Sequence, residues 1–350
     1  MDKPDLIWYI YLEQRGPITR QRQNWTRTHL EQLRLEVRIL RRHLIGKLKV
    51  LALAIVALVA LATAYPLEGR ASDRQELSAS GLSPQVWLPL VSKQWSPGLG
   101  ASPLSRKGVG LACDTTPWQE GADATGADWF YDWSVSSARA DEAGEKYVPM
   151  VRTKYGNLDS ATAFAAAYPG SYWLVGNEPN HVGEDNLAPD EAARAYSGLC
   201  AAILDVDPSA KCIVGGVLNE TEYMGEMLAY WPSTVPIAGL HWHHYGWSSA
   251  ATDTSLLRQR VDSYVAFTQA HDSNWEVWLT EFGVIWTGTE NIPQNDVVDF
   301  IVGAVNYLGA KEGLTRYSWF AWQKCPWQDF PVAELIHPPY AEAYKSAAGG

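Results

Sequence analysis

Short apolar segments alternate with helical stretches from residue 107 onward, at roughly 20–40 residues per pair. Eight segments have the β-branched or aromatic character of buried strands: residues 108–112, 129–133, 147–151, 172–175, 212–217, 237–242, 277–280 and 317–321. Between them, residues 161–167 and 190–205 have helical composition, and Pro189 stands where the second helix would begin. This alternation predicts an α/β protein with a (β/α)8 TIM barrel over residues 107–345.

Two glutamates stand where predicted strands stop. Glu178 follows the fourth strand in the string Gly-Asn-Glu-Pro-Asn at 176–180, and Glu281 follows the seventh in Thr-Glu-Phe-Gly at 280–283. The C-terminal strand ends form the active-site face of a TIM barrel, and these two strands lie across it from each other. Each string alone is also compatible with an ordinary turn. Their joint occurrence in barrel register favours the pair of carboxylates that glycoside hydrolysis requires.

The pattern before the predicted barrel is different. Residues 50–64 form a continuous apolar run after a basic stretch, so residues 44–65 are expected to be a transmembrane signal-anchor or the apolar region of a signal peptide. The string Ala-Thr-Ala at 62–64 resembles a signal-peptidase site, whereas the long basic leader, residues 1–43, favours a retained anchor. Residues 66–106 are rich in Pro, Ser and Gly, which predicts a linker.

Within the basic leader, an apolar stripe recurs at helical spacing. It consists of Leu30, Leu33, Val37, Leu40 and Leu44. The stripe predicts a basic helix that lies on anionic lipid, or a short parallel coiled coil with weak self-association through residues 30–44. A translation start further along the chain would remove this helix altogether.

Charge divides the chain at the apolar run. The net charge is −11, and residues 1–49 carry eleven Lys/Arg against five Asp/Glu, a local +6 that leaves −17 for the rest. This asymmetry fits an N-inside orientation with the acidic domain outside the cytoplasm, anchored in the bilayer or secreted if the signal is cleaved. No phosphate-binding loop, nucleotide fingerprint or Ser-His-Asp elbow is visible, and we expect no nucleic-acid partner.

Further motifs accompany the two glutamates. They are Trp-Phe-Tyr-Asp-Trp-Ser at 129–134, Val-Pro-Met at 148–150, His-His-Tyr-Gly at 243–246 and Arg-Tyr-Ser-Trp-Phe at 316–320. With these motifs, residues 107–345 resemble clan A glycoside hydrolases, and among them the glycosyl hydrolase catalytic-core family that contains the family 128 endo-β-1,3-glucanases. We expect such an enzyme to need no cofactor and no metal.

The resemblance implies roles for individual residues. Glu178 would be the general acid/base and Glu281 the nucleophile of a retaining mechanism, with carboxyl oxygens about 5–5.5 Å apart. Asn177 would hold the sugar 2-hydroxyl, Tyr245 would hydrogen-bond the nucleophile, and Trp319 would form the floor of the subsite at the broken bond. The other residues expected to bind substrate are Tyr131, Trp133 and His243.

The chain departs from the family pattern at three places. The family usually has Asn at the position of Asp132, so a third carboxylate is expected near the site, where like charge would raise neighbouring pKa values. His244 stands where the family usually has Trp. Residues 218–222, Leu-Asn-Glu-Thr-Glu, replace an apolar segment after the fifth strand. These departures concern the substrate more than the reaction.

Histidines and aromatic residues gather near the predicted strand ends. His241, His243 and His244 could suggest a metal site, but metal-dependent amidohydrolase barrels carry such a pair on the first strand, which has no histidine here. His243 is therefore interpreted as a polar group lining the cleft. The chain has 17 Trp and 17 Tyr, some expected to stack on sugar faces and the rest to fill the core.

Four cysteines in an exported chain suggest disulfides. Cys113 ends the first strand and Cys325 follows the eighth, which are neighbours in a closed barrel. Cys200 and Cys212 lie on a helix and the strand after it. We therefore predict the pairs 113–325 and 200–212, against the alternative of four buried thiols.

These observations predict a retaining endo-β-glycosidase that hydrolyses an extracellular polysaccharide, expected to be β-1,3-glucan. One alternative is a retaining clan A enzyme for another β-glycan, such as mannan, galactan or xylan. Another is a non-catalytic carbohydrate-binding barrel, which would keep the aromatic residues but would not need both Glu178 and Glu281.

Overall fold

A computed structural model describes residues 105–111, 118–153, 158–286, 292–325 and 331–347. Its eight strands are β1 (Lys107–Gly110), β2 (Trp129–Tyr131), β3 (Met150–Val151), β4 (Tyr172–Val175), β5 (Lys211–Leu218), β6 (Gly239–His244), β7 (Glu276–Phe282) and β8 (Arg316–Trp319). All ladders are parallel, in the order β2-β1-β8-β7-β6-β5-β4-β3. The eight strands predicted from the sequence are confirmed.

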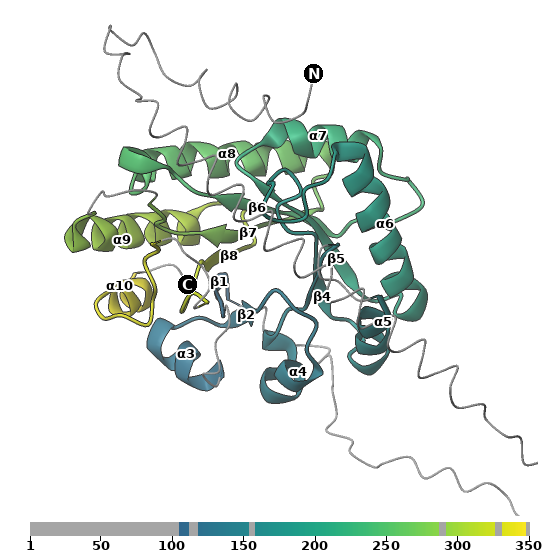
Figure 1. Ribbon diagram of the computed structural model, residues 1–350, viewed down its shortest axis with the longest axis horizontal. Helices are drawn as coiled ribbons and strands as arrows, with labels where there is room; N and C mark the ends of the chain where they lie inside the picture. Colours follow the sequence, from purple (N-terminus) through teal and green to yellow (C-terminus); the bar gives the residue numbers. More distant parts are fainter. Residues whose placement is uncertain (1–104, 112–117, 154–157, 287–291, 326–330, 348–350) are drawn as a thin grey trace, which may run out of the picture. The chain divides into compact units, whose positions relative to one another are not determined.

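Helices alternate with the strands and surround them (Figure 1). They are α3 (Trp118–Thr125), α4 (Ser137–Ala143), α5 (Leu158–Ala167), α6 (Pro189–Val206), α7 (Thr221–Ala229), α8 (Thr254–His271), α9 (Gln294–Ala310) and α10 (Tyr340–Ser346), with 3-10 turns η1 (Gly144–Lys146) and η2 (Ser248–Ala250). As expected, Pro189 opens α6, where the Glu191 side chain accepts a hydrogen bond from the Ala188 amide at 3.1 Å.

The sheet closes between β2 and β3 through a short contact. Phe130 and Tyr147 form an isolated parallel bridge, and the Val148 amide donates to the Phe130 carbonyl at 2.9 Å. Strand β3 is shorter than predicted because Pro149 has no amide hydrogen to continue the ladder. The result is a nearly closed barrel of the TIM type.

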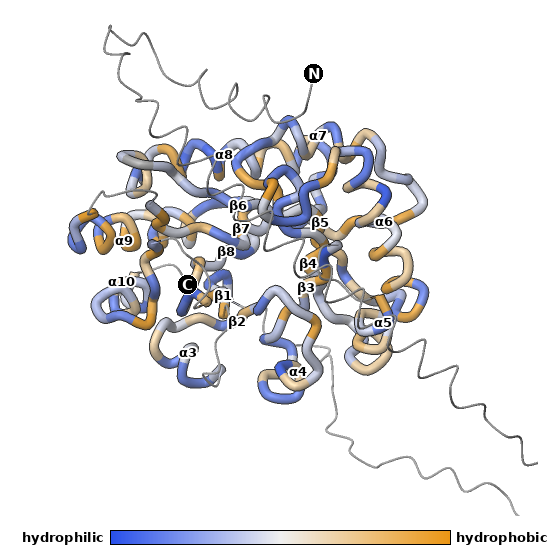
Figure 2. The backbone as a smooth tube through the Cα atoms, viewed as in Figure 1, coloured by the Kyte–Doolittle hydropathy of each residue, from blue (hydrophilic) through white to orange (hydrophobic). Residues whose placement is uncertain are grey.

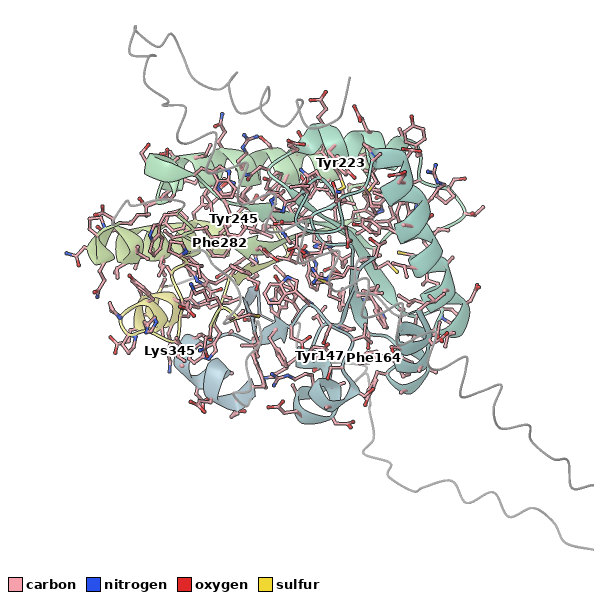
Figure 3. The ribbon with its side chains drawn as sticks, viewed as in Figure 1. Tyr147, Phe164, Tyr223, Tyr245, Phe282 and Lys345 are labelled. Atoms are coloured by element: carbon pink, nitrogen blue, oxygen red, sulfur yellow. The ribbon has the colours of Figure 1, made fainter. Side chains whose placement is uncertain are left out.

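Buried side chains form two layers, one inside the barrel and one between strands and helices. The inner layer contains Trp129, Tyr131, Val148, Met150, Leu174, Ile213 and Trp278. The outer layer includes aromatic pairs such as Tyr147 and Phe164, whose ring centroids lie 6.2 Å apart (Figure 3). Polar and apolar stretches alternate along the surrounding helices (Figure 2), as expected where one face of each helix is buried.

A buried cation fills the N-terminal end of the barrel. The Arg316 guanidinium lies 4.3 Å from the ring centroid of Tyr172 and 4.2 Å from that of Trp278. Both rings donate hydrogen bonds of 2.8 Å to the carboxylate of Glu276. Cation–π stacking and hydrogen bonding fill this end and leave the opposite, C-terminal end as the open face.

The predicted leader (1–43), membrane segment (44–65) and most of the predicted linker (66–106) lie outside the described residues. Backbone contacts divide the chain into Met1–Leu88 and Pro89–Gly350, and every described residue belongs to the second unit. Across the described ranges, none of the helices has the length and apolarity needed to cross a bilayer.

The predicted 200–212 disulfide is wrong. Cys200 on α6 and Cys212 on β5 are buried free thiols, and a hydrogen bond joins them. The two side chains are neighbours as expected, but adjacency alone does not make a disulfide, and a buried thiol packs well as a small apolar group. Cys325 is disulfide-bonded, whereas its predicted partner Cys113 lies outside the described residues, so that pair stays a prediction.

Candidate active site

Unusual backbone conformations gather at the C-terminal strand ends. Trp133 after β2, Glu178 after β4 and Asn219 after β5 have φ values of 55°, 45° and 59°, in the left-handed region that non-glycine residues rarely adopt. Each such residue costs on the order of 1–3 kcal/mol, and structures retain this strain mainly at functional sites. The strained positions therefore mark the open face of the barrel as the candidate site.

Glu178 and Glu281 meet over this face as the sequence predicts. One carboxylate oxygen of each and Nδ1 of His243 lie within 4.8 Å of one another. The His243 nitrogen is 3.0 Å from Oε1 of Glu178 and 3.4 Å from Oε2 of Glu281. Retaining glycosidases hold their carboxyl groups about 5–5.5 Å apart and inverting enzymes about 6.5–9.5 Å. The separation thus fits the retaining arrangement.

Three aromatic side chains donate hydrogen bonds to Glu281. The Tyr245 hydroxyl reaches Oε2 at 2.8 Å, and the Trp133 indole and the Tyr131 hydroxyl reach Oε1 at 2.8 and 3.3 Å. Burial raises the pKa of Glu281 to about 6, while His243 and the hydrogen bonds from Tyr245 and Trp133 oppose the rise. Tyr131 and Trp133, expected to bind substrate, thus contact the carboxylate directly.

Glu178 lies in a different electrostatic environment. Burial raises its pKa to about 7; Glu184 adds to the rise, and His181 and Arg152 oppose it. The His181 Nδ1 atom lies 3.4 Å from Oε2 of Glu178. Arg152 pairs with Glu184 at 2.7 Å. With few donors to its carboxylate, Glu178 keeps its proton to higher pH than Glu281 does.

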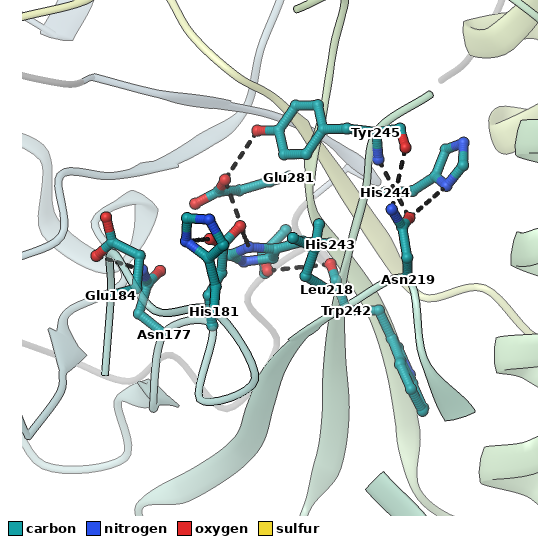
Figure 4. A network of polar contacts seen from close by, with 12 residues as sticks. Asn177, His181, Glu184, Leu218, Asn219, Trp242, His243, His244, Tyr245 and Glu281 are labelled. Atoms are coloured by element: carbon teal, nitrogen blue, oxygen red, sulfur yellow. Dashed lines mark hydrogen bonds and ion pairs between the residues drawn. The ribbon is translucent and has the colours of Figure 1, made fainter. Parts of the chain in front are cut away.

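The three histidines do not converge on one point. His241 Nδ1 contacts the Thr280 hydroxyl at 2.9 Å, and His244 Nδ1 contacts Asn219 Oδ1 at 2.9 Å. His243 instead turns toward Glu281 (Figure 4) and lies 3.0 Å from Oε1 of Glu178, and burial lowers its pKa. The three histidines therefore do not form a joint ligand set, and the potential ligand atoms that cluster in the described residues are those of His243, Glu178 and Glu281.

Asn177 directly precedes Glu178, and its side-chain oxygen is available to a ligand. Its Nδ2 donates to Oε2 of Glu184 at 3.2 Å, and its backbone amide donates to Asp185 at 3.1 Å. Within the described part of the chain, its buried Oδ1 has no hydrogen-bond partner. A buried acceptor without a partner is costly unless a ligand supplies the hydrogen.

The expectation for Trp319 is wrong. Its side chain is fully buried, its indole donates to the Ala333 carbonyl at 3.0 Å, and its ring packs against Phe300 of α9 and Tyr344 of α10. Side chains alternate across a strand, so the next residue, Phe320, turns toward the site instead. The Phe320 ring contacts those of Trp133 and Tyr245, at 5.5 and 6.0 Å between centroids.

The three departures from the family pattern have different outcomes. Asp132 accepts hydrogen bonds from Ser134 and Tyr147 instead of facing the glutamates. The third carboxylate that raises the pKa of Glu178 is Glu184. The other two departures, His244 and the altered segment 218–222, contact each other through the hydrogen bond between His244 and Asn219.

Sequence reasoning missed His181, Glu184 and Arg152. Arg152 directly follows β3, so the strand-end argument used for the glutamates also applies to it. His181 and Glu184 lie in the loop between β4 and α6, where no periodic pattern predicts which way a side chain points.

Comparison with known proteins agrees with this geometry. Residues 110–337 match the family described as glycosyl hydrolase catalytic core, and the chain belongs to that family. No curated protein matches the sequence.

Solved structures with the same fold include three family GH128 enzymes. One is a curdlan-specific exo-β-1,3-glucanase of subgroup III from Blastomyces gilchristii, with 23% identity, a TM-score of 0.52, and 70% of this chain and 100% of that chain covered. An endo-β-1,3-glucanase of subgroup II from Sorangium cellulosum has 21% identity, a TM-score of 0.53 and 69% and 98% coverage. A subgroup I endo-β-1,3-glucanase from Amycolatopsis mediterranei, in complex with laminaritriose, has 21% identity, a TM-score of 0.50 and 69% and 99% coverage.

Proposed function

We propose that the protein is a retaining β-glycosidase with Glu281 as nucleophile and Glu178 as general acid/base. The observation that carries the proposal is the approach of the two carboxylates within 4.8 Å in environments that separate their pKa values, about 6 for Glu281 and about 7 for Glu178. Between these values, one carboxylate is ionised and the other protonated, as a double displacement requires.

In the first step, a Glu281 oxygen bonds to the anomeric carbon as the glycosidic C–O bond breaks. Glu178 gives its proton to the departing oxygen, so the leaving sugar departs as an alcohol. Donors from Tyr245 and Trp133 hold the Glu281 carboxylate in place. The free Oδ1 of Asn177 accepts from the sugar 2-hydroxyl.

In the second step, a water attacks the anomeric carbon and the bond to Glu281 breaks. Glu178, now ionised, takes the proton from this water and returns to its starting state. His243 contacts both carboxylates and holds them at a fixed separation through both steps. Two displacements at one carbon leave the anomeric configuration unchanged.

The proposed substrate is a β-1,3-glucan. Support comes from family membership and from structural neighbours that are exo- and endo-β-1,3-glucanases. We propose endo action, as expected from the sequence, with mannan, galactan and xylan as the alternatives to be tested.

We also propose that the domain acts outside the cytoplasm, held by the apolar segment at residues 44–65. Support comes from the basic leader and the acidic domain on either side of that segment. Sequencing the N-terminus of the membrane-fraction protein tests this. An intact leader is expected, and a chain that begins at Tyr65 would replace the anchor with cleavage and secretion.

One experiment tests the reaction and the substrate together. The purified full-length protein is incubated with linear β-1,3-glucan, β-mannan, β-galactan and xylan, and products are sized and followed by NMR. We expect β-1,3-glucan to give internal cleavage products with the β-configuration. Products with the α-configuration, or no hydrolysis of any glycan, would contradict the proposal.

A further inference from the structure

Asn219 connects the ends of β5 and β6 through four hydrogen bonds, and its side chain reaches His244 and Tyr245 (Figure 4). Its backbone amide donates to the His243 carbonyl at 3.0 Å. Its Oδ1 accepts from Nδ1 of His244 at 2.9 Å and from the Tyr245 amide at 3.3 Å, and its Nδ2 donates to the Tyr245 carbonyl at 3.0 Å. Asn219 therefore holds three consecutive residues at the end of β6: its main chain holds His243, and its side chain holds His244 and Tyr245.

The geometry requires both halves of the Asn219 amide. The oxygen faces two donors and the nitrogen faces a carbonyl, so a carboxylate would place a negative oxygen against the Tyr245 carbonyl. The left-handed φ of 59° turns the side chain toward β6, and asparagine tolerates this conformation better than most residues. Burial lowers the pKa of His244 to about 4, so its ring stays neutral at higher pH.

Tyr245 is the residue that this arrangement positions. Its main chain is fixed on both sides by Asn219, and its buried hydroxyl donates to Oε2 of Glu281 at 2.8 Å. A displacement of the Tyr245 backbone would therefore displace a donor to the nucleophile, and small displacements in such sites reduce rates strongly.

We propose that Asn219 is a positioning residue for the nucleophile, acting through Tyr245 on Glu281. The inference rests on the proposed glycosidase function and extends it to a side chain that does not itself contact Glu281. Asn219 fixes the position and direction of the Tyr245 ring through the Tyr245 main chain. The Tyr245 hydroxyl in turn holds the Glu281 carboxylate.

The test uses full-length Asn219→Gly and Tyr245→Phe variants, alone and combined. Glycine accepts the backbone conformation and removes only the side-chain bonds. The matched control is Asn186→Gly, because Asn186 also has a left-handed φ, of 49°, and is exposed in the loop between β4 and α6. Rates are measured on a β-1,3-linked glucan oligosaccharide with a dinitrophenyl leaving group.

We expect Asn219→Gly to lower kcat on the order of 10-fold, with KM changed less than about 2-fold, and to move the acid limb of the pH profile upward. Asn186→Gly is expected to leave kcat, KM and the pH profile unchanged. In the Tyr245→Phe background, Asn219→Gly should add little further loss, because the hydrogen bond it supports is already absent. Asn219→Asp keeps the acceptor but sets a carboxylate oxygen against the Tyr245 carbonyl, so it should also lower kcat relative to wild type.

Two results would overturn the inference while leaving the proposed function intact. One is an active wild type with an Asn219→Gly variant that matches Asn186→Gly; the other is a full additional loss in the Tyr245→Phe background. If Asn219→Gly does not fold, Asn219→Asp is measured instead, alone and combined with Tyr245→Phe, and the same two results would overturn the inference. A wild type that turns over no glycoside would instead contradict the proposed function, and the role of Asn219 with it.

Discussion

Glu178 and Glu281 are 103 positions apart in the chain (281 minus 178), yet both contact the same nitrogen of His243, at 3.0 and 3.4 Å. Two buried carboxylates this close disfavour simultaneous ionisation, so the pair tends to hold one proton. Donors around Glu281 direct that proton to Glu178. The predictions below concern where the proton resides and what it does.

The first prediction concerns the role of Glu178. Glu178→Gln should reduce hydrolysis of natural glucan by roughly 10²–10⁴-fold, because the leaving oxygen needs a proton. With a dinitrophenyl glycoside, which needs none, the variant should still form the glycosyl-enzyme in a rapid burst. Stopped-flow release of dinitrophenol measures the burst. Equal inactivity toward natural and activated substrates would refute the assignment.

The second prediction is a bell-shaped dependence of kcat/KM on pH. Glu281 must be ionised, so activity should fall as pH drops through about 6. Glu178 must be protonated, so activity should fall as pH rises through about 7. The apparent values belong to the coupled pair. The burst phase on the activated substrate, which needs no proton from Glu178, should show the acid limb alone in both wild type and Glu178→Gln.

The third prediction concerns stability. The pKa of Glu178 rises from the ordinary 4.5 to about 7 in the folded state, so the folded protein binds this proton more tightly than the unfolded chain. Its contribution to stability is complete below about 4.5 and lost as pH rises through 7. Glu178→Gln should therefore be about 1–3 kcal/mol more stable than wild type at pH 8 and nearly equal at pH 4.

Guanidinium unfolding of wild type and variant at both pH values measures this difference. The control is Glu222→Gln, at an exposed position in the first turn of α7, which should show no such pH dependence. A Glu178→Gln variant that is less stable than wild type at pH 8 would contradict the burial argument.

The fourth prediction assigns a sugar-binding role to Trp247. Its side chain is 47% exposed, and its ring centroid lies 6.4 Å from that of Tyr245. An exposed indole beside the site can stack on a glucosyl ring. Trp247→Ala should raise KM for long glucan about 10-fold with kcat nearly unchanged.

Tyr230 provides the control for Trp247. It is also an exposed aromatic residue, at 63%, but it follows α7, at the opposite end of the barrel from the active face. Tyr230→Ala should leave KM unchanged. Equal effects of the two substitutions, or a normal KM for Trp247→Ala, would exclude this sugar contact.

The barrel and the catalytic pair were predictable from the sequence because both depend on regular features. Apolar segments identified all eight strands, and positions near the C-terminal strand ends brought Glu178 and Glu281 to one face. Strand β7 runs two residues further than the predicted strand, so Glu281 lies within it and not after it. Pro149 shortened β3, which its missing amide hydrogen explains.

Side-chain direction was harder to predict. Trp319 and Phe320 differ by one position at the end of β8, and that single step decides which ring faces the site. His181 lies in a loop, where tertiary packing alone brings it beside Glu178. Cys200 and Cys212 are adjacent as expected, but adjacency did not determine their oxidation state.

The most direct test of the double displacement is to trap its intermediate. The full-length protein is treated with a 2-deoxy-2-fluoro glucan oligosaccharide carrying a dinitrophenyl leaving group, digested, and analysed by mass spectrometry. Fluorine slows both steps, and the activated leaving group allows the first to proceed, so the glycosyl-enzyme should accumulate. We predict one glycosyl adduct on the peptide that contains Glu281, and none in Glu281→Gln. An adduct on a different residue, or turnover without any adduct and with inverted product, would contradict the account.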